Sequence, residues 1–262
     1  SSSRDLITLF VGLELLSLSS YILAGIRKKQ LKSNEAALKY LINGGISTAI
    51  TLFGMSYLYG ITGTTNLIEM QPYLTQITDP AIYYLLGIAF LMIFVGLSFK
   101  IATVPFHMWA PDVYEGSPTP VTAFLSVVSK AAGFVLILRL FLWVFATIPV
   151  NSISESMLVS MQGFVAIVAS LTMVVGNTIA LRQKNVKRML AYSSIAHAGY
   201  LLVALSSFSN LFYLDTIWFY LVTYVFMNLG AFAVLQLVMK ETGSEDLTAF
   251  AGLAKRSPFI AI

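Results

Sequence analysis

The sequence predicts an all-α integral membrane protein: a polytopic helical bundle of about seven transmembrane helices, with one helix broken near Pro105. Composition is the first reason, because 57% of the 262 residues are hydrophobic and only 11% are charged. Soluble domains do not have this balance. Length is the second reason, since a helix needs about 20 apolar residues to cross a hydrocarbon core of about 30 Å, and the chain holds several such stretches. We expect residues 1–262 to form a single membrane domain.

Seven stretches are long and apolar enough to cross a bilayer as helices. They cover residues 5–26, 36–60, 82–114 with an interruption, 119–147, 158–181, 187–207 and 213–240. Consecutive helices must alternate in direction, so every second connecting loop lies on the same side of the membrane.

The basic residues are divided unequally between the two sides. Only Arg4 falls on one side, whereas twelve of the sixteen lysines and arginines fall on the other. Such a bias predicts that the basic loops face the cytoplasm of a multi-pass protein in the cell inner (plasma) membrane. We interpret these charges as solvated loop ends that set topology, in preference to lipid or nucleic-acid binding. They are Arg27, Lys28, Lys29, Lys32, Lys39, Arg182, Lys184, Lys187, Arg188, Lys240, Lys255 and Arg256.

The third span is unusual in both charge and backbone. It places Lys100 in an apolar segment and then has prolines at Pro105 and Pro111, each expected to break the helix, with His107 between them. A lysine at the centre of a spanning helix costs about 2.5 to 3.5 kcal/mol on insertion scales. Backbone groups freed by a helix break must find partners in neighbouring helices or in a cavity. The combination indicates a transport site.

Four ionisable residues fall near the middle of their spans: Glu14, Lys100, Lys130 and His197. Their similar depth predicts a row along the membrane plane. Each has small or hydroxyl-bearing residues at helical spacing on the same face, which could hold water. These neighbours are Ser17 and Tyr21 for Glu14, Gly96 for Lys100, Ser126 and Gly133 for Lys130, and Ser193, Ser194 and Tyr200 for His197.

Glu14 and Lys100 could form a switchable acid–base pair. At about 4 Å and an effective dielectric of about 20, their attraction is about 4 kcal/mol, so that moving the carboxylate away could release the lysine proton. The alternative is a static buried ion pair with a structural role only. The residues alone leave both interpretations open.

Four motifs resemble a known family. They are LFVGLELLSLSSY (residues 9–21), SNEAALKYL (33–41), FKIATVPFHMWAPDVYEGSPTPVTAFLSVVSKAA (99–132) and NVKRMLAYSSIAHAGYLL (185–202). Together they resemble the subunit N family of the proton-pumping NADH:quinone oxidoreductases, respiratory complex I. The third motif marks the wider antiporter-like family, which includes multisubunit cation/proton antiporters.

The resemblance implies a fold of about fourteen helices with two inverted five-helix repeats, each with one broken helix. This chain would be an internal fragment holding the fifth to eleventh helices. Glu14 would set the occupancy of Lys100, which takes up a proton and passes it through Lys130. His197 would continue the row or only pack. His107 would gate the cytoplasmic entry or cap the broken helix ends.

Three further charged residues have competing interpretations. Arg139 lies nearer the outer surface, where extending its guanidinium towards water is the simplest explanation. Asp112 and Glu115 are expected on the cytoplasmic loop of the broken region, where proton collection competes with helix capping and solvation.

Motifs for redox chemistry are missing from the sequence. It has no cysteine, no G-x-G-x-x-G or G-x-x-x-x-G-K turn, and no histidine pair with metal-ligand spacing. We therefore expect no cofactor, no metal and no direct NADH or nucleic-acid binding. The resemblance implies a membrane subunit of a proton-translocating oxidoreductase (a translocase), with neighbouring antiporter-like and small subunits and the lipid bilayer as partners. The alternatives are a subunit of a sodium/proton antiporter complex and a purely structural membrane scaffold.

Overall fold

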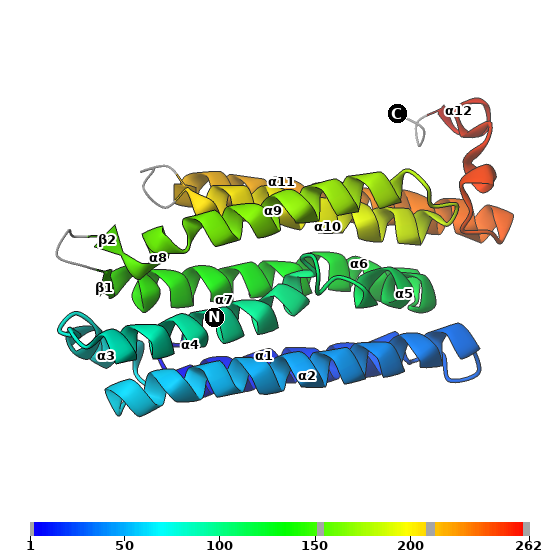
Figure 1. Cartoon of the computed structure of the whole chain (residues 1–262). Helices are drawn as coiled ribbons and strands as arrows, with labels where there is room; N and C mark the ends of the chain where they lie inside the picture. Colours follow the sequence, from blue (N-terminus) through cyan, green and yellow to red (C-terminus); the bar gives the residue numbers. More distant parts are fainter. Residues whose placement is uncertain (1–2, 151–154, 208–212, 259–262) are drawn as a thin grey trace.

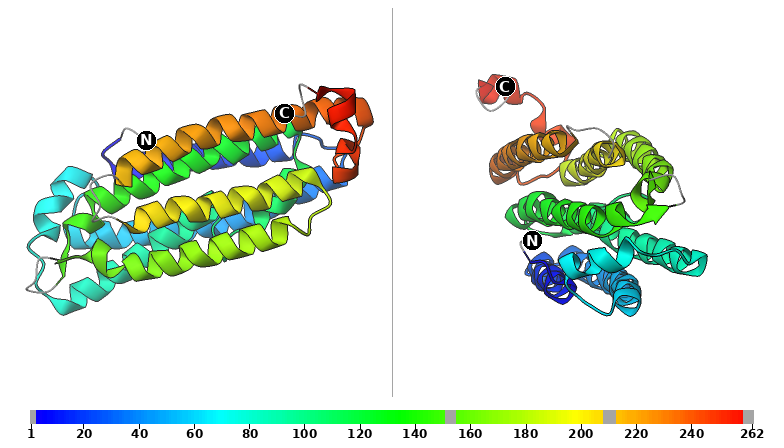
Figure 2. Two further views of the ribbon diagram at one scale, coloured as in Figure 1. Left: turned by 90° about the horizontal axis from the view of Figure 1, so that it is seen from above. Right: turned by 90° about the vertical axis from the view of Figure 1, so that its left-hand side faces the viewer.

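The computed structural model describes residues 3–150, 155–207 and 213–258 and arranges their helices in three layers (Figure 1). The end-on view in Figure 2 separates the layers clearly. One outer layer holds α1 (Leu6–Ala24), α2 (Leu31–Thr62) and the short α3 (Leu67–Leu74). The middle layer holds α4 (Pro80–Ile101), α5 (Trp109–Gly116), α6 (Thr119–Phe124) and α7 (Lys130–Trp143). The other outer layer holds α9 (Gln162–Ala180), α10 (Val186–Ser206) and α11 (Tyr213–Thr242).

The predicted fold class is confirmed. Within the described residues, seven helices are long and apolar enough to cross a membrane, and each overlaps one predicted span. The fourth is continuous but irregular, because a π-helical turn, η1 (Leu125–Ser129), separates α6 from α7 and a 3₁₀ turn, η2 (Phe145–Thr147), ends it. Extra backbone in such a turn changes the direction in which the following side chains point.

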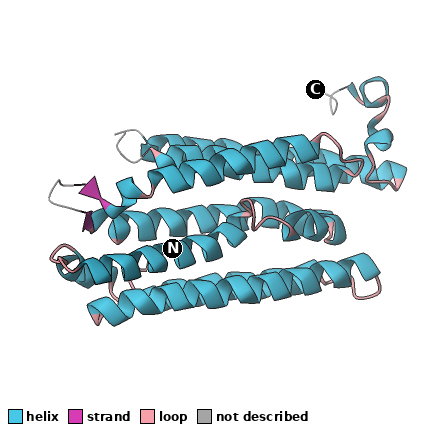
Figure 3. Ribbon diagram, in the orientation of Figure 1, coloured by secondary structure: helices cyan, strands magenta, loops and turns pink. Residues whose placement is uncertain are grey.

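Several short elements at the bundle ends were not predicted from the sequence (Figure 3). Two-residue strands β1 (Pro149–Val150) and β2 (Glu155–Ser156) pair antiparallel, and α8 (Met157–Ser160) follows them. The predicted fifth span therefore divides, with its spanning part starting at Gln162. A 3₁₀ turn, η3 (Leu247–Phe250), and α12 (Leu253–Arg256) follow α11. These elements are too short to give a periodic hydrophobic pattern.

The break near Pro105 is confirmed, and it is made by several features together. Helix α4 ends at Ile101 and is capped by Ala102, which is left-handed with φ 59° and ψ 47°, and the Val104–Pro105 peptide is cis. The freed backbone is partly satisfied by other helices, since the Val104 amide donates to Thr172 Oγ1 on α9 at 3.1 Å. The Trp109 indole of α5 donates to the Phe99 carbonyl of α4 at 3.0 Å.

The second expected break, at Pro111, is wrong. Pro111 lies in the first turn of α5, which continues to Gly116. Backbone N–H groups in the first turn have no intrahelical acceptor, so a proline there removes no hydrogen bond. Proline position relative to the helix start, rather than proline itself, decides whether the helix breaks.

Aromatic stacking holds the second half of the broken helix against α2. The rings of Tyr40 and Trp109 are stacked at 4.4 Å between centroids, and Tyr21 meets Tyr40 edge-on at 4.7 Å. Helix α5 also packs against α10. It therefore joins one outer layer of the bundle to the other.

Helices α2 and α4 approach so closely at Gly96 that no side chain fits there. A Cβ atom at Gly96 would lie 1.7 Å from Thr51 Oγ1 and 2.7 Å from the Ser47 carbonyl oxygen. Moving a hydroxyl would not be enough, because the second clash is with backbone. Glycine is therefore required by packing at this position.

We predict that Gly96→Ala destabilises the fold by about 1 to 3 kcal/mol, because α2 and α4 must separate to admit the methyl group. Thermal unfolding of the purified protein in detergent would measure this as a lower melting temperature. Gly12→Ala is the matched control, since a Cβ at Gly12 has nothing within 4 Å. Equal melting temperatures for the two variants would contradict the packing argument.

Candidate functional site

The Lys100 ammonium lies inside the bundle at the meeting of three helices. The residue is 2% exposed, and its Nζ donates a hydrogen bond to Ser17 Oγ of α1 at 3.0 Å. The same atom lies 6.0 Å from the centroid of the Tyr40 ring of α2. A hydroxyl oxygen and an aromatic face both stabilise a positive charge that has left water.

Glu14 is half-buried on α1, one helical turn before Ser17. Its Oε1 accepts a hydrogen bond from Thr48 Oγ1 of α2 at 2.6 Å. The direct ion pair that the sequence suggested, between Glu14 and Lys100, is not among the ion pairs formed by the described residues, and Ser17 contacts the ammonium instead. The two charges are therefore linked by one turn of α1 and a serine hydroxyl.

Lys130 is buried to the same extent as Lys100, with 2% exposure, and points to a different helix. Its Nζ donates to both the carbonyl oxygen and the hydroxyl of Ser194 on α10, at 2.7 and 2.8 Å. Ser194 Oγ in turn lies 3.4 Å from the Tyr114 hydroxyl of α5. Lys130 directly follows the π turn η1, a backbone feature often found at functional sites.

The two lysines lie on helices in direct contact. Gly133 is one turn after Lys130, and a Cβ there would lie 2.7 Å from Ile101 Cγ2 and 3.4 Å from Lys100 Cγ. The backbone of α7 therefore packs against the aliphatic part of Lys100. Glycine at this position brings the helix of the second lysine beside the side chain of the first.

His197 lies one turn after Ser194 on α10 and is surrounded by tyrosines. Its Nδ1 is hydrogen-bonded to the Tyr220 hydroxyl of α11. The rings of Tyr200 and Tyr224 pack beside it, with centroid distances of 5.5 and 5.4 Å. Ser194 and His197 thus lie one turn apart on the same side of α10, and Lys130 of α7 is bound to Ser194. The roles of these residues stay predictions.

His107 occupies the segment between α4 and α5. It is 9% exposed, and its ring centroid lies 6.5 Å from that of Tyr192 on α10. Its carbonyl oxygen accepts from the Ala110 amide at 3.0 Å, inside the first turn of α5. Within the described ranges its Nδ1 has no hydrogen-bond partner. Gating and capping by the imidazole both stay predictions.

Asp112 and Glu115 lie on α5, not on the loop where the sequence placed them, and both are ion-paired. Arg188 of α10 contacts Asp112 at 2.7 Å and Glu115 at 2.9 Å. On the other side, Lys39 of α2 contacts Asp112 at 2.6 Å, and Lys32 contacts Glu115 at 2.7 Å. Helix α5 has only 8 residues, and these ion pairs hold it between α2 and α10.

The ion pairs shift the acidity of both carboxyl groups, which lie outside the seven spanning helices. Burial alone would raise the pKa of Asp112, but hydrogen bonds from Lys39 and Arg188 hold it below its ordinary value. For Glu115, hydrogen bonds from Lys32 and Arg188 likewise outweigh burial and lower the pKa. Both groups therefore favour the charged form that the surrounding cations require.

Lys187 corrects our interpretation of the basic loop residues. Sequence position suggested a solvated loop end, yet this lysine is 0% exposed. Its Nζ contacts Glu245 Oε1 at 2.6 Å and donates to the Ser117 carbonyl at 3.0 Å. Glu245 follows α11, far along the chain, so local sequence gives no sign of the pair.

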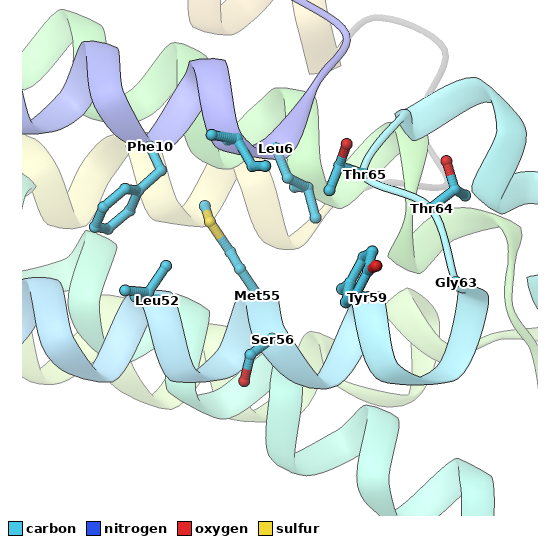
Figure 4. A pocket seen from close by; sticks show the side chains of 10 residues that line it. Leu6, Phe10, Leu52, Met55, Ser56, Tyr59, Gly63, Thr64 and Thr65 are labelled. Atoms are coloured by element: carbon cyan, nitrogen blue, oxygen red, sulfur yellow. The ribbon is translucent and has the colours of Figure 1, made fainter.

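A pocket of about 550 Å³ lies between α1 and α2, at the end of the bundle away from their connecting loop (Figure 4). Its walls include Leu6, Phe10, Leu52 and Met55, and no acidic or basic side chain lines it. It is therefore separate from the ionisable residues described above. Within the described residues, no group of three or more His, Asp or Glu side chains could hold a metal ion.

With buried lysines bound by serines, a broken helix and, within the described residues, seven helices long and apolar enough to cross a membrane, the chain is a multi-span membrane protein. The family model described as NADH:quinone oxidoreductase/Mrp antiporter, transmembrane, matches residues 3–262. The chain belongs to this family, which confirms the resemblance drawn from the motifs.

Individual relatives agree with this assignment. NADH-quinone oxidoreductase subunit N of Geobacillus sp. (strain WCH70) is 62% identical over the whole chain, which covers 53% of that protein. The chain therefore spans about half the length of the curated relatives it matches. Respiratory complex I from Thermus thermophilus with bound aureothin contains a chain that is 39% identical, with a TM-score of 0.78. The match covers 99% of the present chain and 52% of the Thermus chain. The archaeal membrane-bound sulfane sulfur reductase contains a chain that is 29% identical, with a TM-score of 0.87. That match covers 99% of the present chain and 50% of the archaeal chain.

We predict that Lys187→Met destabilises the protein by about 1 to 3 kcal/mol, because the Ser117 carbonyl loses its buried donor and Glu245, whose side chain is 23% exposed, loses its ion pair. Thermal unfolding would report the loss. Lys184→Met is the control, since it makes the same change on an exposed residue of the preceding loop. If the two variants unfold alike, the ion pair contributes nothing measurable.

We also predict that low pH weakens the packing of α5 against α2 and α10. Because the pKa values of Asp112 and Glu115 are lowered in the folded protein, their contribution to stability is present above their ordinary pKa values and is lost as pH falls through the folded-state values. Hydrogen exchange of the α5 amides, corrected for intrinsic rates, should show protection falling below about pH 4. Asp112→Asn should lower protection already at neutral pH and weaken its pH dependence. Constant protection in the native protein down to pH 3 would contradict this prediction.

Proposed function

We propose that this chain carries part of a proton pathway as the antiporter-like subunit N of an NADH:quinone oxidoreductase, with electron transfer in other subunits. One observation carries the proposal: two lysines, each 2% exposed, are held by serine hydroxyls of neighbouring helices at the contact between α4 and α7. A hydroxyl accepts from an ammonium and can also donate, so it can connect two proton carriers. The 62% identity to a subunit N of an NADH-quinone oxidoreductase supports the choice of complex.

The proposed order of proton carriers is Lys100, Lys130 and His197. Contact between α4 and α7 at Gly133 supports the first step, and the shared side of α10 supports the second. Glu14 would modulate Lys100 through its field and through Ser17, since the two do not form an ion pair. Moving one proton against 100 mV requires about 2.3 kcal/mol, which would come from partner subunits of the complex.

The orientation in the membrane is also part of the proposal. The loops after α1 and α9 and the segment after α11 lie at one end of the bundle, to the right in Figure 1. These are the segments rich in lysine and arginine. We infer that this end faces the cytoplasm, by the positive-inside rule.

Two other functions make different predictions. The family description also includes Mrp antiporters, so sodium-dependent proton exchange would indicate a sodium/proton antiporter subunit. A structural scaffold would tolerate joint replacement of Glu14 and Lys100 by well-packed apolar residues, with assembly and pumping retained.

We predict that Lys100→Ala and Lys100→Arg both abolish most coupled proton pumping. Alanine removes the carrier, and arginine keeps the charge but does not release its proton. The full-length subunit would be assembled in its parent complex in proteoliposomes, and electron transfer and dye quenching would be followed together, with and without sodium. Lys29→Ala, on an exposed loop residue, serves as the control. Normal pumping by both assembled Lys100 variants would rule out the proposed pathway.

A further inference from the structure

A second groove, of about 400 Å³, lies between α1 and α2 at the end of the bundle that carries their connecting loop, to the right in Figure 1. Its walls include Leu18 and Ile22 of α1 and Leu38 and Leu41 of α2, which are 47% to 73% exposed. Exposed apolar side chains on adjoining helices mark a surface that meets either lipid or another protein.

The groove follows both helices towards the middle of the membrane. On α2 it extends from Asn34 to Leu41, which is about 10 Å at a rise of about 1.5 Å per residue. At its loop end the two helices touch, because a Cβ atom at Gly25 would lie 2.8 Å from Ala37 Cβ. No acidic or basic side chain lines the groove. Its length and apolar walls suit the first part of a phospholipid acyl chain.

The mouth of the groove is basic. Arg27, Lys28 and Lys29 follow α1 directly, and none of them is in an ion pair with a carboxylate among the described residues. Asn34, which lines the groove, donates from Nδ2 to the Lys28 carbonyl at 3.0 Å and so fixes this part of the loop at the groove. The amide group of Asn34 has a second N–H that can bind a further acceptor.

The start of α2 adds to the positive character of the mouth. Gln30 precedes α2 and makes no side-chain hydrogen bond to its first turn. Amide groups in the first turn of a helix lack intrahelical acceptors and favour a nearby anion. Glu35, the acidic residue next to Asn34, is paired with Lys39 at 2.7 Å.

The pocket at the opposite end of α1 and α2 has carboxylates at its mouth (Figure 4). Thr64 and Thr65 line that pocket, and their hydroxyls donate to the carboxylates of Glu69 and Asp5. Arg4 supplies one positive charge in the same segment. The same two helices thus form two apolar grooves, of which the one at the loop end has the mouth that attracts anions.

We propose that the groove at the loop end binds an anionic phospholipid of the cytoplasmic leaflet. Its acyl chain would lie between Ile22 and Leu38, and its phosphate would bind Lys28 and Asn34. Basic sites between spanning helices on the cytoplasmic side are typical of anionic lipid recognition. Lys28 would therefore bind a ligand in addition to setting topology. The inference uses the proposed orientation only to name the leaflet, and the proton pathway has no part in it.

The test uses the full-length subunit in its assembled parent complex, in nanodiscs that contain phosphatidylglycerol and phosphatidylcholine. A density map should show an acyl chain between Ile22 and Leu38 and a phosphate beside Lys28. Native mass spectrometry of the delipidated complex, titrated with phosphatidylglycerol, should show about fivefold weaker binding at one site in Lys28→Gln. Leu38→Trp, whose indole would fill the groove, should lose that site.

Two control variants make the same changes elsewhere. Lys255→Gln removes an exposed lysine, and Leu52→Trp adds an indole to the pocket at the opposite end, so both should keep the site. Melting temperatures of all variants in lipid-free detergent should match the native complex, which separates loss of lipid from loss of fold. A map with a protein segment in the groove overturns the inference, as does equal affinity for the two lipids or unchanged binding in Lys28→Gln. The pumping measured in the Lys100 variants tests the proposed function separately.

Discussion

The interior of this bundle is organised by the cost of placing ammonium groups away from water. Each buried lysine is bound by polar groups of another element: Lys100 by Ser17, Lys130 by Ser194, and Lys187 by Glu245 and the Ser117 carbonyl. These contacts join α1 to α4, α7 to α10, and α10 to the segment after α11. An arrangement that separated any of these pairs would leave a charge in a low-dielectric interior, which is strongly unfavourable.

The broken helix follows the same rule for backbone groups. Thr172 accepts from the Val104 amide, and the Trp109 indole binds the Phe99 carbonyl, so other elements supply partners that a continuous helix would have supplied itself. Ending α4 directly after Lys100 frees space for α5, which carries its own acidic residues to cations on both outer layers. The freed backbone groups are thus compensated by α9 and α5, and the acidic residues of α5 by cations of α2 and α10.

Sequence predicted the parts of this structure that depend on local pattern. Apolar length gave the seven spans, and spacing placed Ser17 beside Glu14 and Ser194 beside His197. The same spacing could not show that these serines bind Lys100 and Lys130, because those contacts cross between helices. Tyr40 and Tyr114 were not predicted as site residues for the same reason, since their contacts with Lys100 and Ser194 also cross between helices. Pro111 was misjudged because its effect depends on where α5 begins, and Lys187 because its partner lies in a distant segment.

The contacts between residues 245–247, which follow α11, and the start of α10 also affect how the protein folds during its synthesis. The Val186 amide donates to the Glu245 carbonyl at 2.9 Å, and the Leu247 amide donates to the Lys184 carbonyl at 2.9 Å, beside the Lys187 ion pair. Ribosomes deliver a chain from its N-terminus, so the start of α10 is synthesised before Glu245 and Leu247 exist. The start of α10 must remain hydrated until residues 245–247 emerge, and only then can Lys187 enter the bundle. Completion of the packing at the start of α10 is therefore tied to synthesis of α11 and the turn that follows it.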